Sequence, residues 1–246
     1  MALGLAAINT YRNREWKQTL GYFANVNQGA LTVATTNVSG VQVRIRKEGG
    51  DNLGSLHKHS ITHAVQDVAA AGHALPDLDF YLCSSGNIPN VAMKTYTGAT
   101  PKPVIFLGPN MWAKNAMQPG TNGVITGGIG QNGVRGVANQ VYDGTQRWFG
   151  NPKQKSQGTT IVVHELGHIL HEINNPGVFW EEQQAAEAMG GAPSPNGVGW
   201  QNQSVDVSNY AGNNALEFAA EVFAGTIVGK VYSAAVMNIY GNLGGP

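Results

Sequence analysis

The strongest signal in this chain is a nine-residue stretch, Val162-Val163-His164-Glu165-Leu166-Gly167-His168-Ile169-Leu170. Residues four apart share one face of a helix, so the ring nitrogens of His164 and His168 can bind one metal ion. Glu165 follows the first histidine, where its carboxylate can reach a water molecule at the open position of that ion. The composition predicts only about 0.007 chance occurrences of this H-E-x-x-H spacing. The stretch therefore predicts a helix that carries a catalytic metal site.

A third ligand must come from elsewhere, because a catalytic zinc ion keeps three protein ligands and one open position. A metzincin motif would need Gly at position 171 and His at 174, where this chain has His171 and Asn174, so that class is excluded. The segment 207–224 offers Glu217 and Glu221, which are four residues apart on one helical face. One of them can bind zinc while the other holds a ligating histidine in its correct tautomer.

These two segments resemble the gluzincin peptidases. H-E-L-G-H at 164–168 is followed by S-x-Y-A-x-x-N-x-x-E-F-x-A-E-x-F at 208–223, which is similar to the catalytic domain of anthrax lethal factor and related bacterial toxin and effector metallopeptidases. The resemblance covers roughly residues 160 to 225. It implies that Glu217 is the third zinc ligand, that Tyr210 steadies the oxyanion, and that Glu221 is a supporting residue.

The resemblance also implies a function. We expect a zinc-dependent endopeptidase that cleaves a protein or peptide substrate with zinc-activated water, with Glu165 as the general base. By resemblance it is a secreted bacterial toxin or effector, delivered into a target cell by a route without a cleaved signal peptide, with an immunity or secretion partner. Two alternatives stay open: a catalytically silent binding module stabilised by zinc, and an intracellular housekeeping peptidase. Glu165 argues against the first, because a structural site has no use for a base.

The remaining patterns predict one α+β domain over 1–246, a zincin-like fold with a small mixed sheet and a helical lower lobe. We expect an N-terminal extension at 1–50 that contains a hairpin, and a catalytic core at about 55–230. The expected elements are a hairpin at 31–47 with its turn at 37–40, a helix at 57–73, strands at 79–83 and 103–107, the motif helix at 159–173, helices at 179–189 and 213–228, a loop at 190–203 and a short C-terminal helix. The strand before the motif helix, within 103–135, should be the edge to which an extended peptide adds.

Composition excludes several other classes. Fifteen basic residues balance fifteen acidic ones, which leaves no electrostatic footprint for nucleic acid or an anionic membrane. The single cysteine, Cys83, excludes a disulfide framework and a cysteine zinc site. The apolar stretch 219–240 is interrupted by Glu221 and Lys230, which favours buried helices over a membrane span. The apolar start at 1–8 lacks the basic region of a signal peptide.

Other candidates have simpler interpretations. His57, His59 and His63 form a second histidine cluster, but Lys58 opposes a bound cation and no acidic residue follows the first histidine, so we expect an exposed helix face. His171 shares the face of the motif histidines, where packing or a supporting hydrogen bond is the simpler role.

Two further features were weighed against the main hypothesis. Asp206 is a rival third ligand, because aspzincin peptidases use an aspartate after their motif helix, but the G-T-x-x-D context of that family is missing. The glycine-rich stretch at 120–136 includes Gly127-Gly-Ile-Gly130, which is not a phosphate loop because no Lys-Ser/Thr follows.

Overall fold

The computed structural model describes residues 3–25, 32–47, 55–82, 93–96, 103–107, 157–188, 192–208 and 210–246. The first half of the chain contributes α1 (Leu5–Asn25), β1 (Thr32–Val38), β2 (Val41–Lys47), α2 (Ser55–Ala70), β3 (Leu78–Leu82), β4 (Met93–Tyr96) and β5 (Val104–Leu107). The second half contributes α4 (Gln157–Asn174), α5 (Pro176–Glu187), α6 (Trp200–Ser204), the 3-10 turn η4 (Tyr210–Gly212), α7 (Ala215–Ile227) and α8 (Ala234–Asn242). The fold is a mixed α/β arrangement. Cys83 and the glycine-rich stretch at 120–136 lie outside the described residues.

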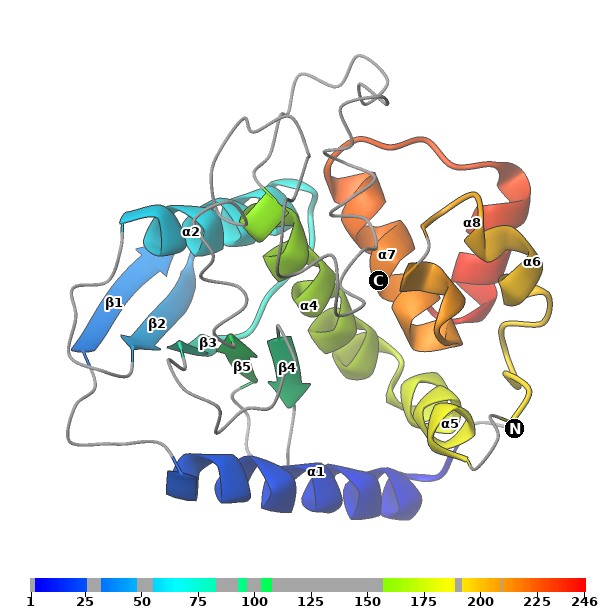
Figure 1. Ribbon diagram of the computed structural model, residues 1–246, viewed down its shortest axis with the longest axis horizontal. Coiled ribbons are helices and arrows are strands. Elements are labelled where there is room, and N and C mark those ends of the chain that lie inside the picture. Colours follow the sequence, from blue (N-terminus) through cyan, green and yellow to red (C-terminus); the bar gives the residue numbers. More distant parts are fainter. Residues whose placement is uncertain are drawn as a thin grey trace.

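The five strands form one mixed sheet in the order β1-β2-β3-β5-β4 (Figure 1). The expected hairpin is confirmed, since β1 and β2 are antiparallel and Val38 is opposite Val41. Its turn is Ser39–Gly40, and both residues have positive φ, 52° and 87°, as a primed two-residue turn requires. β2, β3 and β5 are parallel neighbours, and β4 runs antiparallel to β5.

Two expectations about the sheet need correction. The hairpin that we placed in an N-terminal extension pairs with the rest of the sheet, because β2 runs parallel to β3 from Val43↔Leu78 to Lys47↔Leu82. The strand at Val104–Leu107 is not an edge, because β3 and β4 flank it on both sides. The short strand β4 was not predicted, since Met-Lys-Thr-Tyr has no apolar run. Residues 108–135, the rest of the predicted edge region, lie outside the described part of the chain.

Helices α2 and α4 pack against each other, α2 also packs on β1 and β2, and α4 passes beside β4. The expected stripe on α2 is buried at Ile61, Val65 and Val68, and the helix stops before Gly72, whose φ is 93°. α4 buries an apolar face made of Val162, Val163, Leu166, Ile169 and Leu170. All four residues of β5 are also buried, so both faces of the sheet are covered there.

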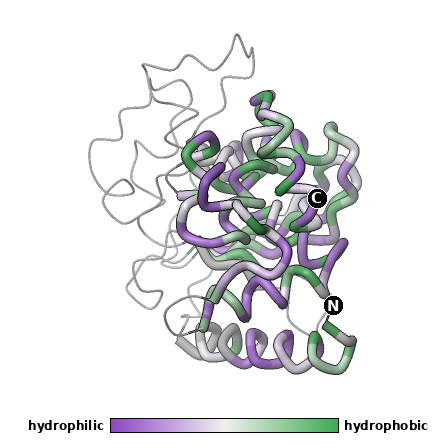
Figure 2. The backbone as a smooth tube through the Cα atoms, turned by 90° about the vertical axis from the view of Figure 1, so that its right-hand side faces the viewer, coloured by the Kyte–Doolittle hydropathy of each residue, from purple (hydrophilic) through white to green (hydrophobic). Residues whose placement is uncertain are grey.

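The N-terminal helix α1 was not predicted and lies along the outside of the molecule (Figures 1 and 2). Polar and aromatic contacts attach it to α4 and α5, and Ile8 is buried. The guanidinium of Arg12 pairs with the buried carboxylate of Glu172 on α4, which also accepts a hydrogen bond from Trp180. Tyr11 stacks on Trp180 with ring centroids 5.7 Å apart. Because a buried carboxylate needs a partner, α1 belongs to the same packed unit as α4 and α5.

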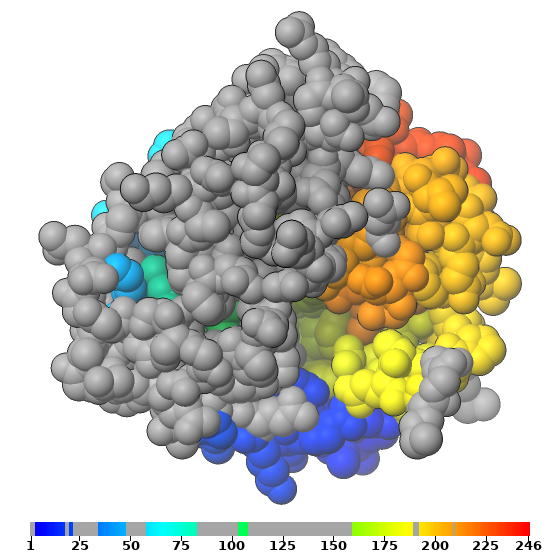
Figure 3. Space-filling model, in the orientation of Figure 1, coloured from blue at the N-terminus to red at the C-terminus, as the bar shows by residue number. Residues whose placement is uncertain are grey.

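After α4, the described chain contains helices and no strand. The predicted helices at 179–189 and 213–228 are confirmed as α5 and α7, and the short C-terminal helix as α8, while α6 lies inside the segment that we expected to be a loop. In Figure 3, atoms of α4 are set back between the yellow atoms of α5 and the orange atoms around η4 and α7. None of the described helices combines the length and the apolar character needed to cross a membrane.

Candidate metal centre

The two motif histidines are held by the burial of α4. The apolar face of this helix is inaccessible to solvent, and His164 and His168 both contact Glu217 of α7. His164 is buried with 5% of its surface exposed, and His168 is half-buried. Their Nε2 atoms are 3.2 Å apart. The i, i+4 spacing in the sequence therefore places two ring nitrogens on one side of the helix, where both are directed at one point.

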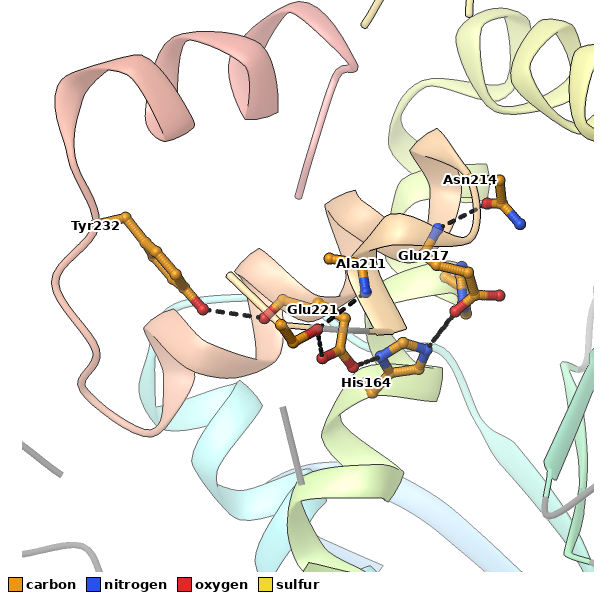
Figure 4. Close-up of polar contacts among 8 residues, drawn as sticks. His164, Ala211, Asn214, Glu217, Glu221 and Tyr232 are labelled. Carbon is orange, nitrogen blue, oxygen red and sulfur yellow. Dashed lines mark hydrogen bonds and ion pairs between the residues drawn. The ribbon is translucent and has the colours of Figure 1, made fainter. Parts of the chain in front are cut away.

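Glu217 enters the same point from the first turn of α7 (Figure 4). The side chain of Asn214 caps this helix, because its Oδ1 accepts a hydrogen bond from the backbone N–H of Glu217 at 2.9 Å. The N-terminal end of a helix also favours a negative charge. Sequence analysis gave Asn214 no role, although Asn followed three residues later by Glu is the spacing of a capping box.

Three ligand atoms converge on one point. Nε2 of His164 lies 3.0 Å from Oε2 of Glu217, and Nε2 of His168 lies 3.5 Å from the same oxygen. With the 3.2 Å between the two nitrogens, they form a nearly equilateral triangle. A tetrahedral ion bound at roughly 2.1 Å separates its ligand atoms by about 3.4 Å. Among the described residues, these three form the group that could hold a metal ion.

The electrostatics of this group favour a positive charge at its centre. Burial by itself lowers the pKa of His164, but the hydrogen bond to Glu217 and the contacts with Glu221 outweigh it and raise that pKa well above its ordinary value. Burial would raise the pKa of Glu217, yet the charge on His168 and the hydrogen bonds from both histidines lower it. The carboxylate therefore stays ionised next to the two rings. A proton or a metal ion can supply the cation that this arrangement stabilises.

Glu221 lies one helical turn after Glu217 and contacts the other side of the His164 ring. Its Oε1 is 2.8 Å from Nδ1 of His164, close enough for a charged pair, although the N–H is not aligned for a linear hydrogen bond. Glu221 itself is buried, with 2% of its surface exposed. A carboxylate at Nδ1 keeps the proton on that nitrogen, so that Nε2 can offer its lone pair to a metal ion at the point where it converges with Glu217.

Tyr210 lies close to the three converging residues, and Glu165 is near enough to Tyr210 for its charge to act on the phenol. The ring of Tyr210, in η4, has its centroid 5.7 Å from that of His164. The negative charge of Glu217 raises the pKa of Tyr210 far above its ordinary value, and burial and the charges of Glu165 and Glu221 add to the effect. The phenol therefore remains a neutral hydrogen-bond donor at any physiological pH. Glu165 is half-buried on the same stretch of α4.

The other sequence candidates lie apart from this group. The side chain of Asp206 is exposed and is not among the converging residues. His171 is buried against Phe179, with ring centroids 5.4 Å apart, and the backbone of Leu243 is close enough to its ring to oppose the lowering of its pKa. It therefore packs, as expected, and is not one of the converging residues. His59 is exposed and His63 half-buried on α2, while the side chain of His57 lies outside the described part.

A glycine inside the motif allows the two halves of the group to meet. A Cβ at Gly167 would lie 2.8 Å from Cδ1 of Phe223, a buried ring on α7. That distance is below any normal carbon contact, so α7 can approach α4 this closely only because position 167 has no side chain. The sequence motif had no requirement for glycine here.

Comparisons with protein-family models, with curated proteins and with solved structures found no match to this chain.

Proposed function

We propose that this protein is a zinc-dependent metallopeptidase with a zincin-like arrangement of its helices. The observation that carries the proposal is the convergence of Nε2 of His164, Nε2 of His168 and Oε2 of Glu217. Peptide hydrolysis needs a base and an oxyanion donor next to the metal. Tyr210 lies beside His164 of this triangle, and the charge of Glu165, the residue after His164, acts on Tyr210. The resemblance to gluzincins in the motif segments agrees with the same assignment.

The donor set fits zinc. Two neutral imidazoles and one carboxylate at these separations suit a tetrahedral ion, which prefers nitrogen and oxygen ligands in such sites. Three protein ligands are the number that a catalytic zinc ion uses, with its fourth position left to water. Glu165 next to the first histidine argues against the alternative of a silent binding module, because a purely structural site has no use for a base.

The residues of the chain divide the work of hydrolysis. When bound, zinc would supply Lewis acidity at a peptide carbonyl and lower the pKa of a water molecule. The carboxylate of Glu165 accepts the proton from the attacking water and later passes it to the leaving amine. The hydroxyl of Tyr210 donates a hydrogen bond to the carbonyl oxygen as negative charge develops there. Its raised pKa keeps that hydroxyl protonated for this role.

We infer a protein or peptide substrate, and a secreted toxin or effector role, from the resemblance to bacterial toxin metallopeptidases. An intracellular housekeeping peptidase is the competing assignment. A gene for an immunity protein or a secretion component next to the gene for this chain would favour the toxin role, and its absence from all close relatives would favour the housekeeping role.

The direct test combines metal analysis with a cleavage assay. The protein, purified without added metal, should contain about one zinc ion per chain, and a peptide library should be cleaved. Glu165→Gln should keep the zinc and the fold but lower turnover by about 100-fold or more, since a general base contributes at least that much. If turnover stayed within threefold of wild type, Glu165 would not be the general base. Stoichiometric iron in place of zinc, or zinc without any cleavage, would refute the metallopeptidase assignment.

A further inference from the structure

A buried serine lies between the turn that carries Tyr210 and the carboxylate that contacts His164. Ser208 has 1% of its surface exposed, and its hydroxyl makes two hydrogen bonds. Oγ donates to Oε2 of Glu221 at 2.6 Å and accepts from the backbone N–H of Ala211 at 2.9 Å. Ala211 is the residue after Tyr210 and lies in the same 3-10 turn, η4. Figure 4 shows this group beside His164.

The direction of both hydrogen bonds is imposed by chemistry. A backbone N–H can only donate, and an ionised carboxylate can only accept. The hydroxyl of Ser208 must therefore accept from Ala211 and give its single proton to Glu221. One hydroxyl thus pairs with two buried groups, the backbone N–H of Ala211 and the carboxylate of Glu221. Leaving either group without a hydrogen bond would cost stability, because both are buried.

The same carboxylate continues the chain of contacts to the candidate metal centre. With Oε2 occupied by Ser208, the second oxygen, Oε1, lies 2.8 Å from Nδ1 of His164. The carboxyl plane of Glu221 is therefore held at both oxygens, and the ring of His164 is oriented by it. Three contacts in series connect the backbone of the Tyr210 turn to Nε2 of His164.

The segment before Ser208 is also anchored. Nζ of Lys230, in the turn after α7, donates to the backbone carbonyls of Asp206 at 3.2 Å and Val207 at 3.1 Å. The chain before Ser208 is thus attached to the turn that follows α7. This places the hydroxyl at one position relative to Glu221, instead of leaving it on a free loop.

We propose that Ser208 is a positioning residue that couples the Tyr210 turn to His164 through Glu221. It sets the orientation of a metal-binding imidazole and the position of an oxyanion donor with a single hydroxyl. The inference rests on the proposed function, because it assigns Ser208 a part in the same metal centre. Neither ligation nor proton transfer to substrate is attributed to Ser208 itself.

The test is a pair of double-mutant cycles. Ser208→Ala should weaken zinc binding by about 3- to 10-fold, less than the 10- to 100-fold typical of a direct partner of a ligand. In a Glu221→Ala background the same substitution should change zinc affinity by less than about twofold, because its effect passes through that carboxylate. Ser208→Ala should also lower kcat with little change in KM, and this loss should shrink in a Tyr210→Phe background.

Two further variants keep the test decisive. Ser208→Thr retains the hydroxyl and should restore zinc affinity, and Ser208→Cys retains the shape with weaker hydrogen bonds and should be intermediate if Ser208→Ala does not fold. The matched control is Ser204→Ala, which removes another buried serine of the same segment. Its hydroxyl donates to the backbone carbonyl of Gln201 at 2.8 Å. It should leave zinc affinity unchanged.

The outcomes separate this inference from the proposed function. Additive effects of Ser208→Ala and Glu221→Ala on zinc affinity, in a protein that does cleave peptides, would overturn the positioning role alone. A wild-type protein that binds zinc but cleaves nothing would overturn the peptidase, while the zinc-affinity cycle would still decide the role of Ser208. No zinc binding by the wild type would overturn both.

Discussion

Two neighbouring helices each carry a pair of histidines four residues apart, and the pairs differ in every other respect. On α4, His164 and His168 direct their Nε2 atoms at a shared point 3.0 and 3.5 Å from Oε2 of Glu217. On α2, His59 and His63 have ring centroids 4.0 Å apart. His59 is exposed, and no third ligand from another described element joins the α2 pair.

The i, i+4 spacing of two histidines does not by itself make a metal site. The i, i+4 geometry is identical in both helices, because it follows from the helical repeat alone. On α4, His164 is buried and contacts the carboxylate of Glu221 at Nδ1, and both histidines face the carboxylate of Glu217. Burial and partners from distant parts of the chain are therefore the discriminating features, and each prediction below tests one of them.

The largest effect should come from the histidines themselves. His164→Ala or His168→Ala removes one of three ligand atoms, so we expect zinc to be lost on dialysis from either variant. His59→Ala and His63→Ala are the matched controls from α2 and should retain about one zinc ion per chain. Zinc content by mass spectrometry or a colorimetric chelator measures all four. If the α2 variants lost zinc to the same extent, the α4 histidines would not be the specific metal ligands.

The next effect concerns the two carboxylates that contact the α4 pair. Glu217→Ala leaves two protein ligands, so zinc affinity should fall sharply. Glu221→Ala should weaken it by roughly 10- to 100-fold, because it removes the partner that orients His164. Asp206→Ala should have no effect, since that side chain is exposed. The measurement is zinc affinity by competition with a chelator in one buffer. Loss of zinc in Asp206→Ala with retention in Glu217→Ala would support an aspzincin-type site.

A smaller effect, on kcat but not on zinc content, distinguishes catalysis from metal binding. Tyr210→Phe should leave zinc in place and lower kcat by about 100-fold, since removing one oxyanion donor costs on the order of 3 kcal/mol of barrier. Steady-state kinetics on the best peptide of the library, together with zinc content, provide the readout. An unchanged kcat would mean that Tyr210 only packs against His164, in the way that the two rings on α2 pack against each other.

The smallest expected effect is on the pH dependence of stability, and it comes from the buried side chain of His171. Burial, with a contribution from His168, lowers the pKa of His171 to about 4, from 6.5 for an ordinary histidine. Below about pH 6.5 the unfolded chain binds a proton at this histidine that the native state does not, so stability is lost as the pH falls toward 4. This residue should contribute a loss of about 2 kcal/mol between pH 7 and pH 5.

Urea unfolding of wild type and His171→Leu at the two pH values measures this loss. The leucine variant should lose less stability than wild type between pH 7 and pH 5, because it has no group that titrates at this position. The same loss in both proteins would show that His171 does not remain neutral in the native state.

Local patterns predicted the elements whose signal is contained within one segment. The alternation in Val41–Lys47 and the apolar stripes of α2 and α4 are confirmed as a strand and two helices. The four-residue strand β4 and the five-residue helix α6 were missed, since neither has an apolar period that distinguishes it from a loop. The hairpin was recognised, but its pairing with β3 was not, because register across distant strands depends on contacts that no local pattern encodes.

The residues of the candidate site also fall into two groups, those that a local sequence pattern could identify and those that depend on tertiary contacts. Asn214 could have been recognised from its position three residues before Glu217, the spacing of a capping box. Ser208 could not, because its role depends on a hydrogen bond to Glu221, thirteen residues later, in a buried environment. His171 shares the sequence face of the two motif histidines, yet the packing of Phe179 covers it.

The sequence by itself determined which side chains share a helical face: His164 with His168, and Glu217 with Glu221, because the helical repeat sets those positions regardless of surroundings. Only the tertiary structure decided which carboxylate meets which nitrogen. That depends on how closely α7 approaches α4, which the missing side chain of Gly167 allows and the buried ring of Phe223 limits. Glu217 then faces both Nε2 atoms and Glu221 faces Nδ1 of His164, because packing of the two helices places their facing turns in one register.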